Sequence, residues 1–131
     1  PSEPHPSAGA CAIGARPVML AYNVWVDAPD AHAVRRTASA IRGPVVRSLA
    51  LDVGGRWQVS CNLIDPAQVG PRELVDLVSA RGAEHGVTVI GTELVGLLPE
   101  SVLDRVDASD RERLDLGVDR TIEWRLRRGR R

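Results

Sequence analysis

Hydrophobic and polar residues alternate along several short stretches of the chain, a two-residue period typical of half-buried β-strands. The clearest case is residues 18–26, where one predicted face holds Val18, Leu20, Tyr22, Val24 and Val26 and the other holds Met19, Ala21, Asn23 and Trp25. Further strands are predicted over residues 45–53, 56–64 and 87–95, which are rich in β-branched residues. Gly54 and Gly55 separate the middle two, as expected for a tight hairpin.

Two longer helices are predicted from apolar residues at helical spacing. Asp27 and Pro29 suit the cap and first turn of one helix, whose apolar face is formed by Ala31, Val34, Ala38 and Ile41. The other covers residues 71–85, ends at Gly86, and has an apolar face formed by Leu74, Leu77, Val78 and Gly82. A short helix is expected over residues 100–106, and Ser109 with Glu112 could form a capping box for a further turn.

The order strand, helix, strand, strand, helix, strand predicts an α+β fold of the ferredoxin-like, split-βαβ type, a two-layer sandwich with a C-terminal helical extension. In the usual strand order of that fold, residues 18–26 and 56–64 form the two central strands. Asn23 then lies beside Ser60 and Asn62, together with Gln58, on the sheet face that the helices leave open. This face either meets solvent or is covered by a second sheet or a ligand, and the neighbouring Met19 and Trp25 favour a cover.

Glu93 stands near the end of the last predicted strand, which the sequence pattern describes as buried. Gly91 and Gly96 frame it, and Pro99 prevents the strand from continuing. A glycine-framed acid at the end of a strand suits the approach of a ligand, although any buried strand followed by a turn shows the same pattern.

Composition excludes some classes of function. The 17 basic and 17 acidic residues cancel, which argues against nucleic acid or an anionic membrane as a partner. The arginines at 125, 127, 128, 130 and 131 are interpreted as a solvated tail or the stub of a linker. RNA binding would need aromatic residues at the strand centres. Cys11 and Cys61 match no zinc pattern, and no apolar run approaches the ~20 residues of a membrane helix. A reduced, cytoplasmic protein is predicted.

No complete catalytic or metal-binding set is found in the sequence. His5, His32 and His85 lack cysteine or carboxylate partners at ligand spacing, so each is interpreted as a surface histidine and no metal is predicted. A nucleophile elbow, a phosphate loop and a dinucleotide fingerprint are absent as well. Any catalysis must therefore use residues from outside this chain.

Four segments carry a family resemblance. PHPSAGACAIGARPVMLAYNVWV, WQVSCNLID and VTVIGTELVGLLP resemble the C-terminal subdomain of glutamate formiminotransferase, also called glutamate formimidoyltransferase, over about residues 1–106. DRTIEWRL resembles the segment that closes that transferase domain. The resemblance implies transfer of a formimino group from N-formiminoglutamate to N5 of tetrahydrofolate, a step of histidine degradation and one-carbon metabolism. It also implies a homodimer in which two subdomains stack their sheets around the folate.

The resemblance divides the chain into three parts. Residues 1–17 would be an extended leader that forms the folate-binding loop and the link to the N-terminal subdomain. Residues 18–106 would be the subdomain itself, and residues 107–131 a C-terminal helix or strand segment with the arginine-rich tail. The family's folate-binding loop matches Pro1, Ser2, Glu3, Pro4, His5, Pro6, Ser7, Ala8 and Gly9.

Two positions depart from the family pattern, and the catalytic histidine is missing. Ala8 stands where animal members carry tryptophan, and Glu93 stands where they carry glutamine, so a neutral amide becomes an anionic acceptor. The family's catalytic histidine belongs to the N-terminal subdomain and matches no residue here. Glu93, Asn23 and Asn62 are the expected substrate-positioning residues. The alternative is a stand-alone ferredoxin-like module that binds a small molecule or regulates, without catalysis.

Overall fold

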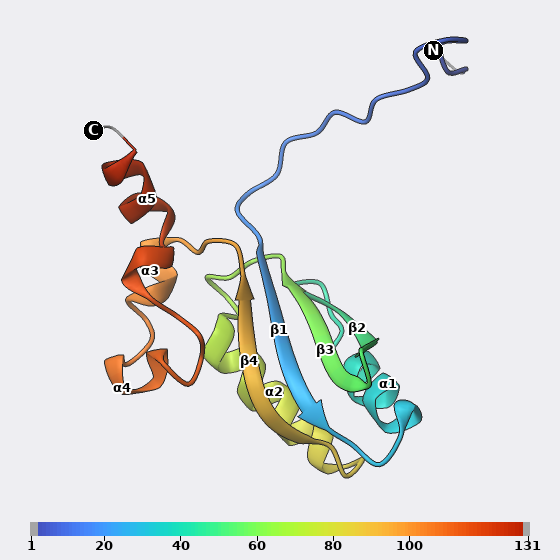
Figure 1. Cartoon of the computed structure of the whole chain (residues 1–131), viewed down its shortest axis with the longest axis vertical. Coiled ribbons are helices and arrows are strands. Elements are labelled where there is room, and N and C mark those ends of the chain that lie inside the picture. Colours follow the sequence, from blue (N-terminus) through green and yellow to red (C-terminus); the bar gives the residue numbers. More distant parts are fainter. Residues whose placement is uncertain (1–2, 130–131) are drawn as a thin grey trace.

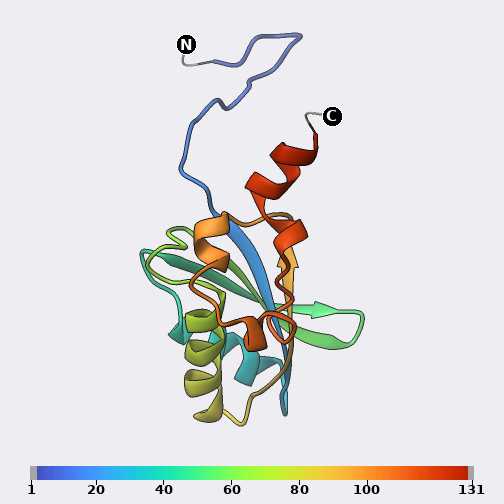
Figure 2. The ribbon, with the colours of Figure 1, turned by 90° about the vertical axis from the view of Figure 1, so that its left-hand side faces the viewer.

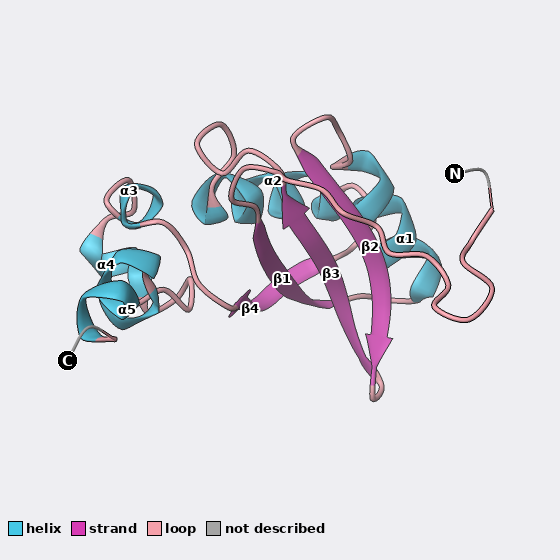
Figure 3. Cartoon of the chain, turned by 90° about the horizontal axis from the view of Figure 1, so that it is seen from above, coloured by secondary structure: helices cyan, strands magenta, loops and turns pink. Residues whose placement is uncertain are grey.

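The computed structural model describes residues 3–129. One four-stranded antiparallel sheet, in the order β2-β3-β1-β4, is built from β1 (Leu20–Asp27), β2 (Val46–Val53), β3 (Arg56–Leu63) and β4 (Thr88–Val95). Two helices, α1 (Ala31–Ala40) and α2 (Pro71–Ala83), cover one face of the sheet and leave the other uncovered (Figures 1 and 3). The predicted ferredoxin-like α+β sandwich is confirmed, with β1 and β3 at its centre.

The core lies between the sheet and the two helices. The helix-facing residues of β1 and β3 are buried: Leu20, Tyr22, Val24, Val26, Val59, Cys61 and Leu63. Val34 and Ala38 of α1 and Leu74 and Val78 of α2 pack onto them from the helix layer. The alternation along β1 therefore identified the covered face correctly, except that Val18 lies before the strand and is exposed.

Some boundaries differ from the prediction. Helix α1 is capped by Asp30, not Asp27, because the Asp30 Oδ1 accepts the Ala33 N–H at 2.8 Å while Asp27 still belongs to β1. Backbone hydrogen bonding to Ala33 also lowers the pKa of Asp30. Helix α2 ends at Ala83, so His85 lies in the following turn, where Gly86 adopts a left-handed φ of 70°.

Strand β4 is an edge strand, which corrects the prediction of a buried one. Leu94 is its only buried residue, because β1 pairs with just one side of β4 and the open sheet face exposes alternate residues. A C-terminal extension, residues 100–129, lies beside the other side of β4 (Figure 2). It contains α3 (Glu100–Leu103), α4 (Ala108–Arg111), the 3-10 helix η1 (Val118–Arg120) and α5 (Ile122–Arg128).

The extension also departs from prediction in its short helices. Helix α3 ends at Leu103, and Asp107 precedes α4, so Ser109 lies inside α4 and forms no capping box with Glu112. No described helix is long and apolar enough to cross a membrane.

Candidate functional site

The open face of the sheet brings polar side chains from three strands together around Glu93. Asn23, on β1, is paired in register with Ser60 of β3 and with Glu93 of β4. The Asn23 Nδ2 donates to Glu93 Oε2 at 3.2 Å, and the Gln58 Nε2 donates to the same oxygen at 3.3 Å. Glu93, Asn23 and Gln58 are called the Glu93 cluster below.

The hydrogen bonds of the cluster leave one carboxylate oxygen available. Both amide donors meet Oε2, and no hydrogen bond within residues 3–129 involves Oε1 of Glu93. Glu93 is half-buried, and no buried side-chain oxygen or nitrogen within the described residues lacks a hydrogen-bond partner, so the unbonded Oε1 lies at the surface. A carboxylate oxygen is an acceptor only, and it binds N–H groups of cationic or amino-substituted ligands with the strength of a charge-assisted hydrogen bond.

Gln58 is the residue of this cluster that the sequence did not select as a site residue. Its alternation in β3 placed it on the open face, and the structure leaves it only 5% exposed. Gln58 is paired in register with Trp25, and its side chain crosses β1 to reach Glu93. The reach of one side chain over an intervening strand has no signal in a single sequence.

Asn62 is not part of the Glu93 cluster. It lies one row away on the open face, paired with Ala21 of β1 and with Arg47 of β2. With Arg47, Leu49 and Ser60 it lines a separate depression of about 350 Å³. Of the three predicted substrate-positioning residues, the structure therefore joins Asn23 to Glu93 and places Asn62 apart.

The predicted folate-binding loop projects away from the sheet (Figure 1). All of its described residues are exposed, namely Glu3, Pro4, His5, Pro6, Ser7, Ala8 and Gly9, while Pro1 and Ser2 lie outside the described residues. The loop closes on itself, because the backbones of His5 and Gly9 exchange two hydrogen bonds of 2.9 Å. The Nδ1 of His5 also accepts the Ala8 N–H at 3.1 Å. The structure does not bring this loop to Glu93.

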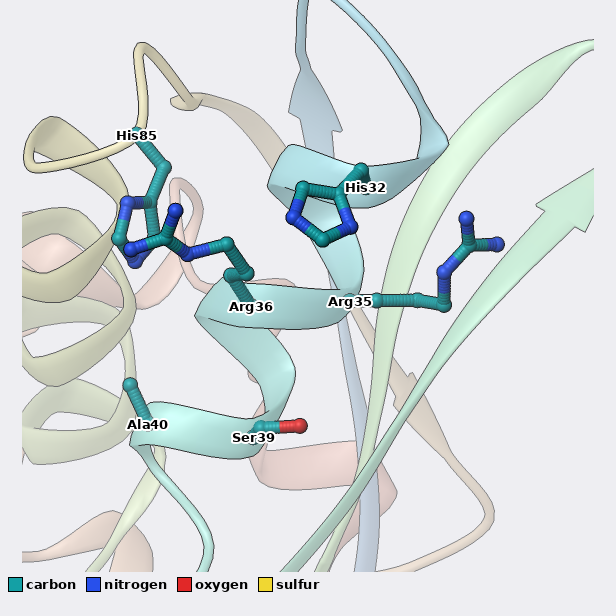
Figure 4. A pocket seen from close by; sticks show the side chains of 6 residues that line it. All are labelled: His32, Arg35, Arg36, Ser39, Ala40 and His85. Atoms are coloured by element: carbon teal, nitrogen blue, oxygen red, sulfur yellow. The ribbon is translucent and has the colours of Figure 1, made fainter.

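A second hollow lies on the helix layer. It has a volume of about 610 Å³ and is lined by His32, Arg35, Arg36, Ser39, Ala40 and His85 (Figure 4). In this view Arg36 points toward the side of the hollow that holds His85, whereas Arg35 points to the other side of α1. His32 is exposed, as predicted for a surface histidine, and His85 is half-buried. Within residues 3–129, no three His, Cys, Asp or Glu side chains are grouped to hold a metal ion.

The two cysteines lie outside both regions and are not joined to each other. Cys11 is exposed in the leader, and Cys61 is buried in the core. Burial raises the pKa of the Cys61 thiol to about 12. Cys61 therefore stays protonated at neutral pH. Because the thiolate is the reactive form of cysteine, Cys61 is an unreactive thiol packed in the core.

Three curated proteins are similar to this chain. A glutamate formimidoyltransferase of Thermoplasma acidophilum is 35% identical over 103 residues, which is 73% of this chain and 34% of that protein. A glutamate formimidoyltransferase of Streptococcus pyogenes is 29% identical over 106 residues, 76% of this chain and 36% of that protein. A formiminotransferase cyclodeaminase-like protein of Arabidopsis thaliana is 35% identical over 111 residues, 80% of this chain and 37% of that protein.

The matches cover different shares of this chain and of its relatives. They cover most of this chain, but the chain spans only about a third of the length of the relatives. No family model matches the chain.

Proposed function

The chain belongs to the glutamate formimidoyltransferase family, and we propose that it supplies the folate-facing surface of such a transferase. The reaction would move a formimino group from N-formiminoglutamate to tetrahydrofolate. The observation that carries this proposal is the Glu93 cluster, in which Oε1 of the acid makes no hydrogen bond within residues 3–129 and lies on an uncovered sheet face. The part proposed for this chain corresponds to the C-terminal subdomain of the family.

The chemistry assigns distinct roles to the polar residues of the open face. Attack of the tetrahydrofolate amine nitrogen on the amidine carbon forms a new C–N bond and a tetrahedral adduct, which then breaks its C–N bond to glutamate. A base takes the proton of the attacking amine and returns it to the departing glutamate nitrogen. Oε1 of Glu93 would accept an N–H of the pterin or of the formimino group and so orient it. Asn23 and Gln58 hold the carboxylate, and Asn62 offers a further polar contact. The base would come from the N-terminal subdomain, because the sequence predicts no catalytic residue in this chain.

The surroundings of the cluster suit a cover by a second sheet. Leu49, Leu51 and Val53 project from β2 beside the polar centre of the open face, and they are 61%, 38% and 45% exposed. Exposed apolar side chains grouped on one face are typical of a surface that another protein layer covers. We propose the N-terminal subdomain of the transferase as that layer, with the leader as the segment that crosses to it and a homodimer as the assembly.

A chimeric enzyme tests the proposed function. In the Thermoplasma acidophilum transferase, the segment that matches this chain is replaced by the corresponding residues of this chain, and formimino transfer to tetrahydrofolate is measured. We expect transfer by the chimera, and we expect Glu93→Ala in it to lower kcat/KM by about tenfold or more through loss of orientation. The matched control is Glu84→Ala, which removes an exposed carboxylate from the turn after α2.

The outcomes separate the transferase from the alternative. Equal effects of Glu93→Ala and Glu84→Ala in an active chimera would remove Glu93 from the site. A chimera that folds but transfers nothing would count against the transferase role. If the isolated chain also self-associates and gives no heat with tetrahydrofolate in calorimetry, a ferredoxin-like binding module that pairs its open face is the better account. In that second candidate, the exposed Leu49 and Leu51 would be covered by the open face of another copy.

A further inference from the structure

The outer edge of β4 is closed by side chains of the C-terminal extension. The backbone N–H and C=O of Leu94 are both bonded to side chains of the extension. The Leu94 N–H donates to Asp115 Oδ2 at 2.9 Å, and the Arg120 guanidinium donates to the Leu94 C=O. Asp115 and Arg120, called the edge pair below, thus make the two hydrogen bonds that a neighbouring strand would make.

The edge pair is itself held in place. Arg120 Nη1 donates to Asp115 Oδ2 at 2.7 Å. The same oxygen accepts the Leu94 N–H, so Asp115 is bonded both to Arg120 and to the strand. Arg120 is also anchored through its backbone, whose C=O accepts the Leu98 N–H at 3.1 Å. Asp115 has a φ of 51°, a left-handed conformation that Asp tolerates better than most residues with a side chain. A local conformation of this kind is retained where surrounding contacts stabilise it.

The same segment fixes the other neighbour of Glu93 in the strand. The Thr92 hydroxyl donates to the Arg113 C=O at 2.9 Å. Thr92 and Leu94 flank Glu93, so both neighbours of Glu93 are bonded to residues 113–120, Thr92 through its hydroxyl and Leu94 through its backbone. On the sheet side, Glu93 is paired in register with Asn23. Around Glu93, the edge strand β4 is therefore held by β1 on one side and by the C-terminal extension on the other, which opposes fraying of the strand.

We propose that Asp115 and Arg120 are positioning residues for the Glu93 carboxylate. The two bonds that orient the carboxylate measure 3.2 and 3.3 Å, near the long end of the range for effective hydrogen bonds, so a small outward movement of β4 breaks them. The edge pair prevents that movement through Leu94. This positioning is a property of the chain without any ligand. It can therefore be tested separately from the proposed binding of folate.

The side-chain amides of the chain provide a direct readout. The sequence holds four such amides, in Asn23, Gln58, Asn62 and Gln68, and only the first two donate to Glu93. In a ¹⁵N-labelled sample, Arg120→Met is expected to shift the signals of both Glu93-bound amides. The other two amides are expected to stay in place and so report an intact fold. Asp115→Ala should reproduce the effect of Arg120→Met.

Two further variants separate positioning from a general loss of structure. Asp115→Asn keeps an oxygen acceptor for the Leu94 N–H and suits a left-handed φ, so it should leave the Asn23 and Gln58 signals close to wild type. Arg113→Met removes an arginine side chain of the same segment that, within residues 3–129, pairs only with Asp110, and it keeps the backbone C=O that Thr92 binds. This control should leave all four amides unchanged.

Hydrogen exchange tests the edge pair without any substitution. In the unaltered chain, the Leu94 amide should exchange about fivefold to thirtyfold more slowly than a solvent-facing edge amide, as expected for a bond of ordinary strength. Exchange at the rate of an open edge would overturn the proposal, even if Arg120→Met fails to fold. A folded Arg120→Met with wild-type Asn23 and Gln58 signals would overturn it as well.

Discussion

The two faces of the sheet are built from the same strands and yet serve different purposes. The helix-covered face is apolar and closely packed, with Leu20, Tyr22, Val24 and Leu63 fully buried. The open face carries small polar groups at its centre and exposed apolar side chains on β2. Because successive strand residues point to opposite faces, one position of a neighbouring pair packs in the core and the other lies on the open face. The covered face supplies the stability, which leaves the open face free to hold an oriented carboxylate.

A pair of adjacent substitutions in β3 gives the largest contrast between the faces. Leu63 is fully buried on the covered face, and Asn62 is exposed on the open face. Leu63→Ala is expected to lower the free energy of unfolding by about 2–5 kcal/mol, through lost apolar burial and the cavity that remains. Asn62→Ala should change it by about 0.5 kcal/mol or less. Urea denaturation of the two variants measures both changes in the free energy of unfolding. Similar losses would contradict the claim that the covered face supplies the stability.

The covered face was predictable from sequence, and most of the candidate site was not. Alternation along β1 separated Tyr22 from Asn23 correctly, because a buried face imposes its period directly on the sequence. The bonds of Gln58 to Glu93 and of Arg120 to Leu94 depend on side chains that reach across or around strands. Residues 113–120 are largely irregular, so no period marks them as partners of β4.

Tyr22 provides a pH-dependent test of the covered face. Its hydroxyl donates to the Leu114 C=O at 2.6 Å, and burial raises its pKa from 10.0 to about 12. A phenol with a raised folded-state pKa stabilises the fold below pH 10.0, and this contribution is lost as the pH rises through about 12. Tyr22 is the only tyrosine, so absorbance at alkaline pH reports its ionisation alone.

The control for this titration is Tyr22→Phe. The buried Cys61 thiol has its pKa raised to about 12 as well, so it adds a pH dependence of the same sign. Tyr22→Phe should keep the pH dependence of stability that comes from Cys61 and lose the pH dependence that comes from Tyr22. Its free energy of unfolding at neutral pH should be about 1 kcal/mol lower, because the Leu114 C=O loses its donor. Ionisation of the wild-type phenol near pH 10.0 would show that Tyr22 is solvated rather than buried.

Only a small change in stability is expected from a substitution in the Glu93 cluster. Glu93→Gln keeps the shape of the side chain and an oxygen that can still accept from Asn23 and Gln58, but it removes the charge that strengthens both bonds. Because Glu93 is half-buried, we expect a loss of about 1 kcal/mol or less in urea denaturation. Glu112→Gln, an exposed acid in the extension, is the matched control. A loss at Glu93 as large as that of Leu63→Ala would mean that the cluster holds the sheet together, and a role in orienting a ligand would then need separate support.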